Sequence, residues 1–207
     1  MNKIILLIII LGVGLIAFKT NQKNALLAVA DTKENELSDA ARYAMAMKEV
    51  KKHLKTNSSY NPDVSFLLDM KRPSGRNRFF VVDLKRDQII DQGLVAHGSG
   101  SETGKKNRLK FSNIDNSHAT SLGSYTIGSS YKGKFGKAYK LYGLDSSNSN
   151  AYARNIVLHK YDSMPYDEQV DPICLSEGCP MVNVEFYKRL QTLIDSSKKQ
   201  IILHIYY

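Results

Sequence analysis

Hydrophobic positions follow two different periods along the chain, which predict helices near its ends and strands between them. From residue 37 to residue 54 apolar residues recur about every 3.6 positions, the spacing of an amphipathic helix. A second helix is predicted over residues 183–196, where Phe186, Leu190 and Leu193 share one face. The runs between them are short, apolar or alternating, and bounded by polar turn residues, as in antiparallel strands: residues 64–70, 78–84, 88–96, 123–127, 139–142, 155–159 and 200–206.

This order of elements predicts a mainly β fold with flanking helices, in the α+β class. A series of short strands is typical of a β-sandwich or a partly closed barrel. The first helix cannot enclose a core alone, so residues 31–62 are predicted to be a helical extension of a domain that covers residues 63–207.

The first residues are typical of export. Lys3 is followed by residues 4–18, which carry no charge. As a helix about 15 residues span roughly 22 Å, less than the roughly 30 Å hydrocarbon core of a membrane. Residues 1–30 are therefore predicted to be a signal peptide cleaved after Ala30, with an uncleaved inner-membrane anchor as the alternative. Both place the rest of the chain in the periplasm or cell-wall space.

Composition narrows the class of protein further. The 207 residues are 43% hydrophobic, which excludes a disordered chain, and two cysteines exclude a four-cysteine zinc site. The net charge of +9 suits a carboxylate-rich polymer as partner. Because zinc-finger spacing and RNA-binding aromatic signatures are lacking, a nucleic-acid partner is not predicted.

The candidate chemistry lies in the second half of the chain. An apolar strand ends at His159, and the segment Ser176-Glu177-Gly178-Cys179-Pro180 precedes the second helix. A protonated histidine lowers the pKa of a neighbouring thiol and then acts as general acid and base. The N–H groups of Gly178 and Cys179 are the expected oxyanion donors. Two simpler interpretations stay open: His159 as a hydrogen-bonded core histidine, and Cys179 in a disulfide with Cys174.

From about residue 64 to the C-terminus the sequence resembles the murein L,D-transpeptidase catalytic domains, the YkuD-like superfamily, in the branch with the motif S-x-G-C-P. The resemblance rests on several separate segments: Val81-Val82-Asp83-Leu84, Val95-Ala96-His97-Gly98-Ser99-Gly100, Ser121-Leu122-Gly123-Ser124-Tyr125-Thr126-Ile127, Ala153-Arg154-Asn155-Ile156-Val157-Leu158-His159 and Ser176-Glu177-Gly178-Cys179-Pro180. The sequence departs from the commonest motif at Glu177, where a histidine is usual, and at Met181, where Arg or Asn is usual.

The resemblance implies an L,D-transpeptidase-like fold and a cysteine acyltransferase that acts on the tetrapeptide stems of peptidoglycan. Cys179 would attack, His159 would move the proton, and an amine of a second stem would complete a 3→3 cross-link. The remaining roles implied are the oxyanion donor Gly178, the loop-shaping Ser176, and the substrate contacts His97, Tyr125 and Arg154. Covalent cysteine catalysis requires no metal or organic cofactor.

Two other functions remain as alternatives. One is an L,D-carboxypeptidase or wall-peptide hydrolase, in which water resolves the same acyl-enzyme. The other is a non-catalytic wall-binding module held by a Cys174–Cys179 disulfide.

Overall fold

The computed structural model describes residues 37–105 and 108–207. The chain forms two units, residues 1–41 and 42–207. In the first unit the description begins at residue 37, so the predicted export segment and its Ala30 cleavage site lie outside the described residues. Over the described ranges, none of the helices has the length and apolar character needed to span a membrane.

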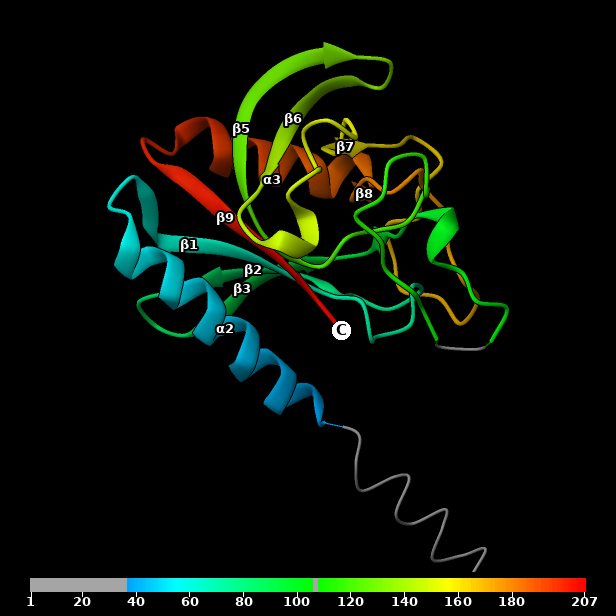
Figure 1. Cartoon of the computed structure of the whole chain (residues 1–207), viewed down its shortest axis with the longest axis horizontal. Coiled ribbons are helices and arrows are strands. Elements are labelled where there is room, and N and C mark those ends of the chain that lie inside the picture. The colour runs from blue at the N-terminus through cyan, green and yellow to red at the C-terminus, as the bar shows by residue number, and fades with distance from the viewer. Residues whose placement is uncertain (1–36, 106–107) are drawn as a thin grey trace, which may run out of the picture. The chain divides into compact units, whose positions relative to one another are not determined.

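The second unit is built on an open sheet of nine strands (Figure 1). Its spatial order is β3-β2-β1-β9-β5-β6-β7-β8-β4. The strands are β1 (Tyr60–Asp69), β2 (Phe79–Asp83), β3 (Gln88–Gly93), β4 (Val95–Ala96), β5 (Gly123–Gly133), β6 (Gly136–Gly143), β7 (Val157–Lys160), β8 (Met181–Val182) and β9 (Gln200–Tyr206). Most neighbours are antiparallel, but β1 pairs with β9 and β7 pairs with β8 in parallel.

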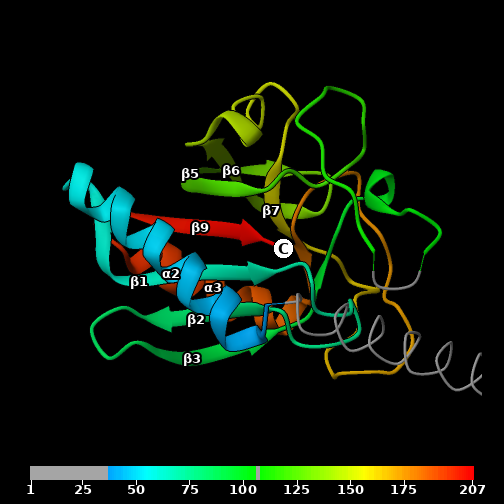
Figure 2. The same cartoon turned by 60° about the horizontal axis from the view of Figure 1, so that its bottom comes forward.

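Alternating side chains of the strands make two hydrophobic cores, one on each face of the sheet. Phe66 and Leu68 of β1 belong to the core under α3 (Val184–Ser196), whose Phe186 and Leu190 are buried there. Leu67, between them, points to the opposite core. The helix α2 (Asp39–Thr56) begins in the first unit and continues into the second. Its buried residues Ala46, Met47 and Val50, which belong to the second unit, are part of that second core. Figure 2 shows α2 in front of β1, β2 and β9, with α3 behind them.

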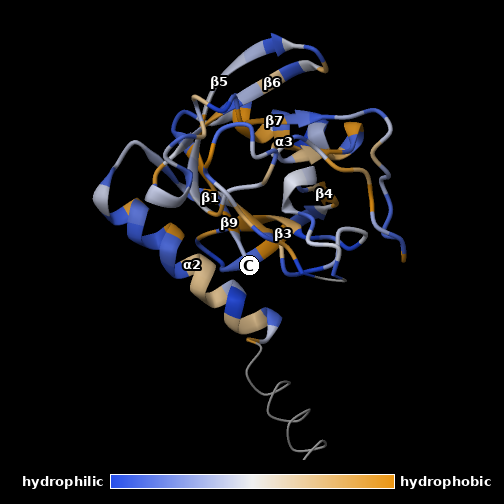
Figure 3. Cartoon of the chain, turned by 45° about the vertical axis from the view of Figure 1, so that its right-hand side comes forward, coloured by the Kyte–Doolittle hydropathy of each residue, from blue (hydrophilic) through white to orange (hydrophobic). Residues whose placement is uncertain are grey.

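The two edge strands of the sheet are almost consecutive in the chain. β3 ends at Gly93 and β4 begins at Val95, although they stand at opposite ends of the strand order. A single intervening residue, Leu94, spans at most about 7 Å. The sheet therefore curls until its edges approach each other without pairing. Figure 3 shows hydrophobic residues along several strands of this sheet.

The predicted fold class is confirmed: the domain is mainly β with flanking helices and an unclosed sheet. Both helices lie close to their predicted bounds, and Asn183 caps α3 by accepting the N–H of Glu185. Two strand predictions are corrected, and one strand was missed. Residues 88–96 form two strands that belong to opposite edges, the strand predicted over residues 123–127 continues to Gly133, and β8 was not predicted.

Candidate active site

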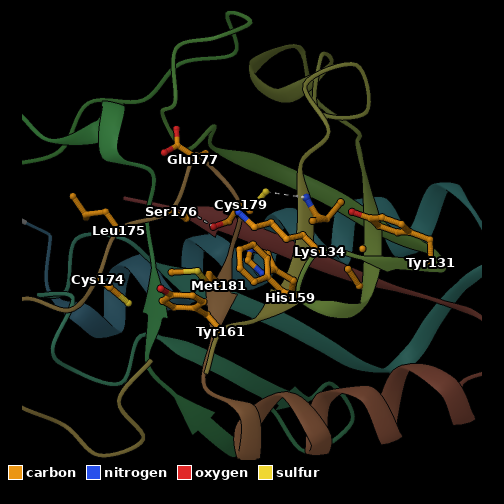
Figure 4. Close-up of a pocket in the computed structure, with 14 residues that line it drawn as sticks. Tyr131, Lys134, His159, Tyr161, Cys174, Leu175, Ser176, Glu177, Cys179 and Met181 are labelled. Carbon is orange, nitrogen blue, oxygen red and sulfur yellow. Dashed lines mark hydrogen bonds between the residues drawn. The ribbon is translucent and has the colours of Figure 1, made fainter. Parts of the chain in front are cut away.

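Parallel pairing of two short strands brings the candidate nucleophile and base together. In this pair His159 of β7 lies opposite Met181 of β8, and the His159 N–H donates to the Pro180 carbonyl at 3.3 Å. Cys179 immediately precedes Pro180. The side chains of Cys179 and His159 line the same cavity of about 530 Å³ (Figure 4). The parallel pair thus places Cys179 two residues before Met181, the residue that lies opposite His159.

Ser176 holds the loop that carries Cys179. Its hydroxyl donates to the Cys179 carbonyl at 2.7 Å and accepts the Gly178 N–H at 3.2 Å. Gly178 has φ +110°, and a Cβ there would come within 2.9 Å of the Ala119 carbonyl oxygen. The loop therefore requires glycine at this position, on both conformational and steric grounds.

These bonds correct the expected oxyanion donors. The Gly178 N–H is already bonded to Ser176 Oγ and points within the loop. Within the part of the chain that the structure describes, the Cys179 N–H has no intramolecular hydrogen-bond partner. Of the two expected donors, only the Cys179 N–H is available to a substrate oxygen.

The Cys179 thiol lies between two backbone groups. Its Sγ accepts the Val157 N–H at 3.4 Å, and its S–H faces the Asn155 carbonyl at 3.7 Å. Burial raises the pKa of the Cys179 thiol above its ordinary value, although the Val157 N–H and the charges of Arg154 and Lys140 act in the opposite direction. The thiol is therefore protonated at neutral pH.

The His159 imidazole has one nitrogen fixed by the backbone. Its Nδ1 lies 2.9 Å from the Lys160 carbonyl, which can only accept, so Nδ1 carries the proton and the lone pair is on Nε2. The ring of Phe135 stacks on the imidazole, with centroids 5.1 Å apart and planes 17° apart. Burial lowers the pKa of His159, so the ring is neutral and able to accept a proton.

Burial therefore favours the neutral forms of both the Cys179 thiol and the His159 imidazole, whereas the sequence predicts a protonated histidine that lowers the pKa of the thiol. Both shifts have burial as their first cause, since a partly desolvated site disfavours charge on either group.

A protein-family comparison shows which family the chain belongs to. The model of the L,D-transpeptidase catalytic domain matches residues 32–206. The chain belongs to the L,D-transpeptidase catalytic domain family. No curated protein matches the chain.

Several solved structures are similar to this chain at low identity. The Ldtfm–avibactam carbamoyl enzyme is 11% identical with a TM-score of 0.42, over 70% of this chain and 49% of that one. An L,D-transpeptidase from Xylanimonas cellulosilytica is 12% identical with a TM-score of 0.38, over 70% and 61%. One from Mycobacterium smegmatis is 10% identical with a TM-score of 0.39, over 70% and 59%. The chain thus spans about half to three-fifths of these proteins, and the family assignment rests on the family model.

Two residues expected to contact substrate have other positions. Tyr125 is fully buried in the core under α3, where its hydroxyl donates to the Ser121 carbonyl at 2.7 Å. Its predicted place in the cleft is wrong because its ring fills the core between β5 and its neighbours. Arg154 is outside the lining of the Cys179 cavity. Its guanidinium instead bonds the segment beside the nucleophile loop, through Ser112 O, Ser117 Oγ, Ala119 O and Ser121 Oγ.

His97 is also separate from the cavity of Cys179. Its Nδ1 accepts from Arg78 Nη2 at 2.8 Å, and its Nε2 donates to Glu102 Oε1 at 2.5 Å. Burial and the charge of Arg78 lower the pKa of His97. Its side chain lines a second cavity and not that of Cys179, and its contact with substrate stays a prediction.

The sequence interpretation missed the residues that the β5–β6 hairpin contributes. Lys134 and Phe135 form its two-residue turn between the paired Gly133 and Gly136, and both line the cavity. Figure 1 shows the ends of β5 and β6 extending past the rest of the sheet. Glycines on both sides of Lys134-Phe135 were a local signal for this turn, whereas the contact with His159 depends on tertiary structure.

Both cysteines are free thiols. The Cys174 S–H lies 3.5 Å from Met164 Sδ, in a small hydrophobic cluster beneath residues 161–175. The bridge required by the non-catalytic alternative is therefore not formed, and the Cys179 thiol remains available.

Proposed function

We propose that this chain is an exported cysteine acyltransferase that makes 3→3 cross-links between peptidoglycan stems. The family assignment supports a peptidoglycan substrate at the level of the family. The single observation that supports the catalytic proposal is the shared cavity, which the side chains of Cys179 and His159 both line, with the lone pair of His159 on Nε2. Because peptidoglycan lies outside the cytoplasmic membrane, the proposal requires export, which the predicted segment of residues 1–30 would provide.

In the first half-reaction Cys179 Sγ bonds to the carbonyl carbon of the third stem residue, in the amide bond that joins this residue to the terminal D-alanine. The S–H proton passes to His159 Nε2, and the Cys179 N–H stabilises the oxyanion. Collapse of the tetrahedral intermediate breaks the C–N bond, and the imidazolium returns the proton to the amine of the departing D-alanine. A thioester on Cys179 and a neutral His159 remain.

In the second half-reaction an amine of another stem attacks the thioester. His159 takes its proton, the new amide forms, and the Cys179 thiolate leaves and is reprotonated by the imidazolium. In this scheme Lys134 binds the terminal carboxylate of the donor stem, since it supplies an ammonium group to the cavity wall. In the commonest motif Arg or Asn stands at the position that Met181 occupies in this chain. In this scheme Lys134 binds the carboxylate in place of that Arg or Asn.

Digestion of tetrapeptide muropeptides with the wild-type protein and with Cys179→Ala tests this proposal. We expect the wild type to release D-alanine and accumulate cross-linked dimers, and the variant to do neither. Tripeptides without dimers would instead identify the L,D-carboxypeptidase or hydrolase, because water would then be the acceptor. Equal turnover by the Cys179→Ala variant would contradict both enzyme functions.

A further inference from the structure

The ammonium group of Lys140, in β6, is held in place near the edge of the Cys179 cavity. Its Nζ donates to Asn155 Oδ1 at 3.2 Å. It also lies 4.8 Å from the ring centroid of Tyr131, which lines the cavity, and 5.6 Å from that of Tyr152. A lysine side chain at a surface usually samples many rotamers, so three simultaneous contacts indicate a defined position.

Asn155 connects this ammonium group to the backbone that faces the nucleophile. Its φ is +56°, in the left-handed region that few residues other than glycine and asparagine adopt. The turn before it is closed by the Ile156 N–H, which donates to the Ala151 carbonyl at 2.9 Å. This conformation leads the chain into β7 and directs the Asn155 carbonyl toward Cys179 Sγ, 3.7 Å away.

The backbone of Lys140 is paired with the other group that contacts the thiol. In the antiparallel pair of β6 and β7, Lys140 lies opposite Val157. The Val157 N–H donates to Cys179 Sγ at 3.4 Å. The Asn155 carbonyl and the Val157 N–H, which both contact the sulfur, therefore belong to residues that Lys140 adjoins, the first through its side chain and the second through strand pairing.

Several titratable and charged side chains surround the thiol of Cys179. Burial favours the neutral form of His159, from β7. The charges of Arg154 and Lys140 lower the pKa of Cys179, and that of Glu177 raises it. Of the two cations, Arg154 is bonded to a separate loop, whereas Lys140 is bonded to the turn whose carbonyl faces the sulfur.

We propose that Lys140 is a positioning residue of the Cys179 site, which holds the Asn155 turn so that its carbonyl orients the thiol. The inference rests on the proposed function, in which Cys179 is the nucleophile. An ammonium group bonded to the Asn155 side chain stabilises the left-handed backbone there, and the same group brings positive charge toward the sulfur. A neutral residue in place of Lys140 leaves the turn less restrained and the thiolate less stable.

Alkylation of Cys179 by iodoacetamide tests this role without any stem peptide. Every protein carries Cys174→Ala, so that a single thiol reacts, and rates from pH 6 to pH 10 give the apparent pKa of Cys179. In Lys140→Met we expect this pKa to rise and the rate at pH 7 to fall roughly threefold, because a partly exposed cation stabilises the thiolate modestly. Lys140→Gln should shift the profile in the same direction, and Lys140→Arg should restore it. A merely structural role of Lys140 would leave the apparent pKa unchanged.

Asn155→Gly separates an effect through the turn from an effect of charge alone. Glycine adopts the left-handed conformation but has no side chain for Lys140 to bond. We therefore expect Lys140→Met to change the apparent pKa of Cys179 less in the Asn155→Gly protein than in the protein with Asn155 intact. Lys132→Met is the control, because it removes a charge from an exposed position of the same hairpin and should leave the profile unchanged.

Three results would overturn the positioning role: an unchanged alkylation profile in Lys140→Met, an equal shift in Lys132→Met, or an undiminished effect of Lys140→Met in the Asn155→Gly protein. Turnover of tetrapeptide stems by the wild-type protein is measured in parallel. Turnover without coupling between Lys140 and Asn155 defeats the positioning role alone. Coupling without turnover defeats the proposed catalysis and leaves the orientation of the Cys179 thiol by the Asn155 turn.

Discussion

Two contacts of the His159 side chain determine which of its nitrogens can accept a proton and how far water reaches the ring. Its Nδ1 faces the Lys160 carbonyl, and one face of its ring is covered by Phe135 at a centroid distance of 5.1 Å. The first contact places the lone pair on Nε2, and the second removes water from the ring. Burial then lowers the pKa of His159, so the imidazole stays neutral below its ordinary pKa of 6.5.

Replacement of Phe135 is expected to change the pH dependence of acylation. In Phe135→Leu water reaches the imidazole, and the pKa of His159 rises toward its ordinary value. The acid limb of the rate profile then moves to higher pH, and the rate at pH 6 falls roughly tenfold as the protonated fraction and the loss of ring orientation combine.

Acylation rates measured from pH 4.5 to pH 8 test this effect. Phe135→Tyr keeps the stacked ring and is expected to retain the wild-type profile. A merely structural role of Phe135 would lower the rate equally at every pH, and an unmoved acid limb in Phe135→Leu would contradict the positioning role.

Individual residue roles could be predicted from the sequence where they depend on neighbours in the chain. Ser176, Gly178 and Cys179 lie in one short motif, and the resemblance to the family singled them out. The positions of Tyr125, Arg154 and His97 depend on distant segments: the core under α3, residues 112–121, and Arg78 with Glu102. Sequence spacing contains no information about which distant group fills the space around a side chain.

At the scale of elements, the segment of residues 112–121 supports the nucleophile loop. Arg154 bonds this segment at four points, and the Ala119 carbonyl lies against Gly178. The loop of Cys179 is therefore supported by this second loop as well as by the N–H groups of Val157 and His159 in β7.

Arg154→Gln is expected to lower the free energy of unfolding by about 2 kcal/mol, because several partly buried acceptors lose their partner. It is also expected to slow acylation, since Ala119 no longer holds the nucleophile loop. Arg86→Gln is the control, because the Arg86 side chain is 74% exposed. Urea unfolding and acylation rates measure both effects. A free energy of unfolding equal to that of the wild type would contradict the role of Arg154.

Helices and strands could be predicted where the segment was long enough for its hydrophobic residues to show a regular period. The alternation of β1 and β2 and the apolar face of α3 are visible in the sequence. β8 has two residues, too few for any period, and its place beside β7 is fixed by the chain on either side. The split of residues 88–96 between two sheet edges follows from the curvature of the whole sheet, which local patterns do not contain.

At the scale of the molecule, acid is expected to destabilise the fold through buried histidines. His204 of β9 is 8% exposed, and Ser124 Oγ lies 2.8 Å from its Nδ1. Burial lowers the pKa of His204 to about 4, whereas the unfolded chain has the ordinary value of 6.5. Between these values the unfolded state binds more protons, so stability is complete above pH 6.5 and falls toward pH 4.

This difference corresponds to at most about 3 kcal/mol of stability lost at pH 4. His204→Leu removes the titration and is expected to flatten the dependence of the unfolding free energy on pH, while Ser124 loses a partner at every pH. Urea unfolding at pH 4, 5, 6 and 7 measures both curves. An undiminished slope in the variant would assign the acid sensitivity elsewhere.

The whole account depends on a covalent bond between a stem peptide and Cys179, and intact-protein mass spectrometry detects that bond directly. After brief incubation with tetrapeptide stems, we expect the protein to gain the mass of the stem minus D-alanine, on the proteolytic fragment that contains Cys179. Cys179→Ala and His159→Ala should show no adduct, and Cys174→Ala should show the full one. Release of D-alanine without an adduct in the wild type, or an adduct on Cys174, would contradict the assignment of the nucleophile.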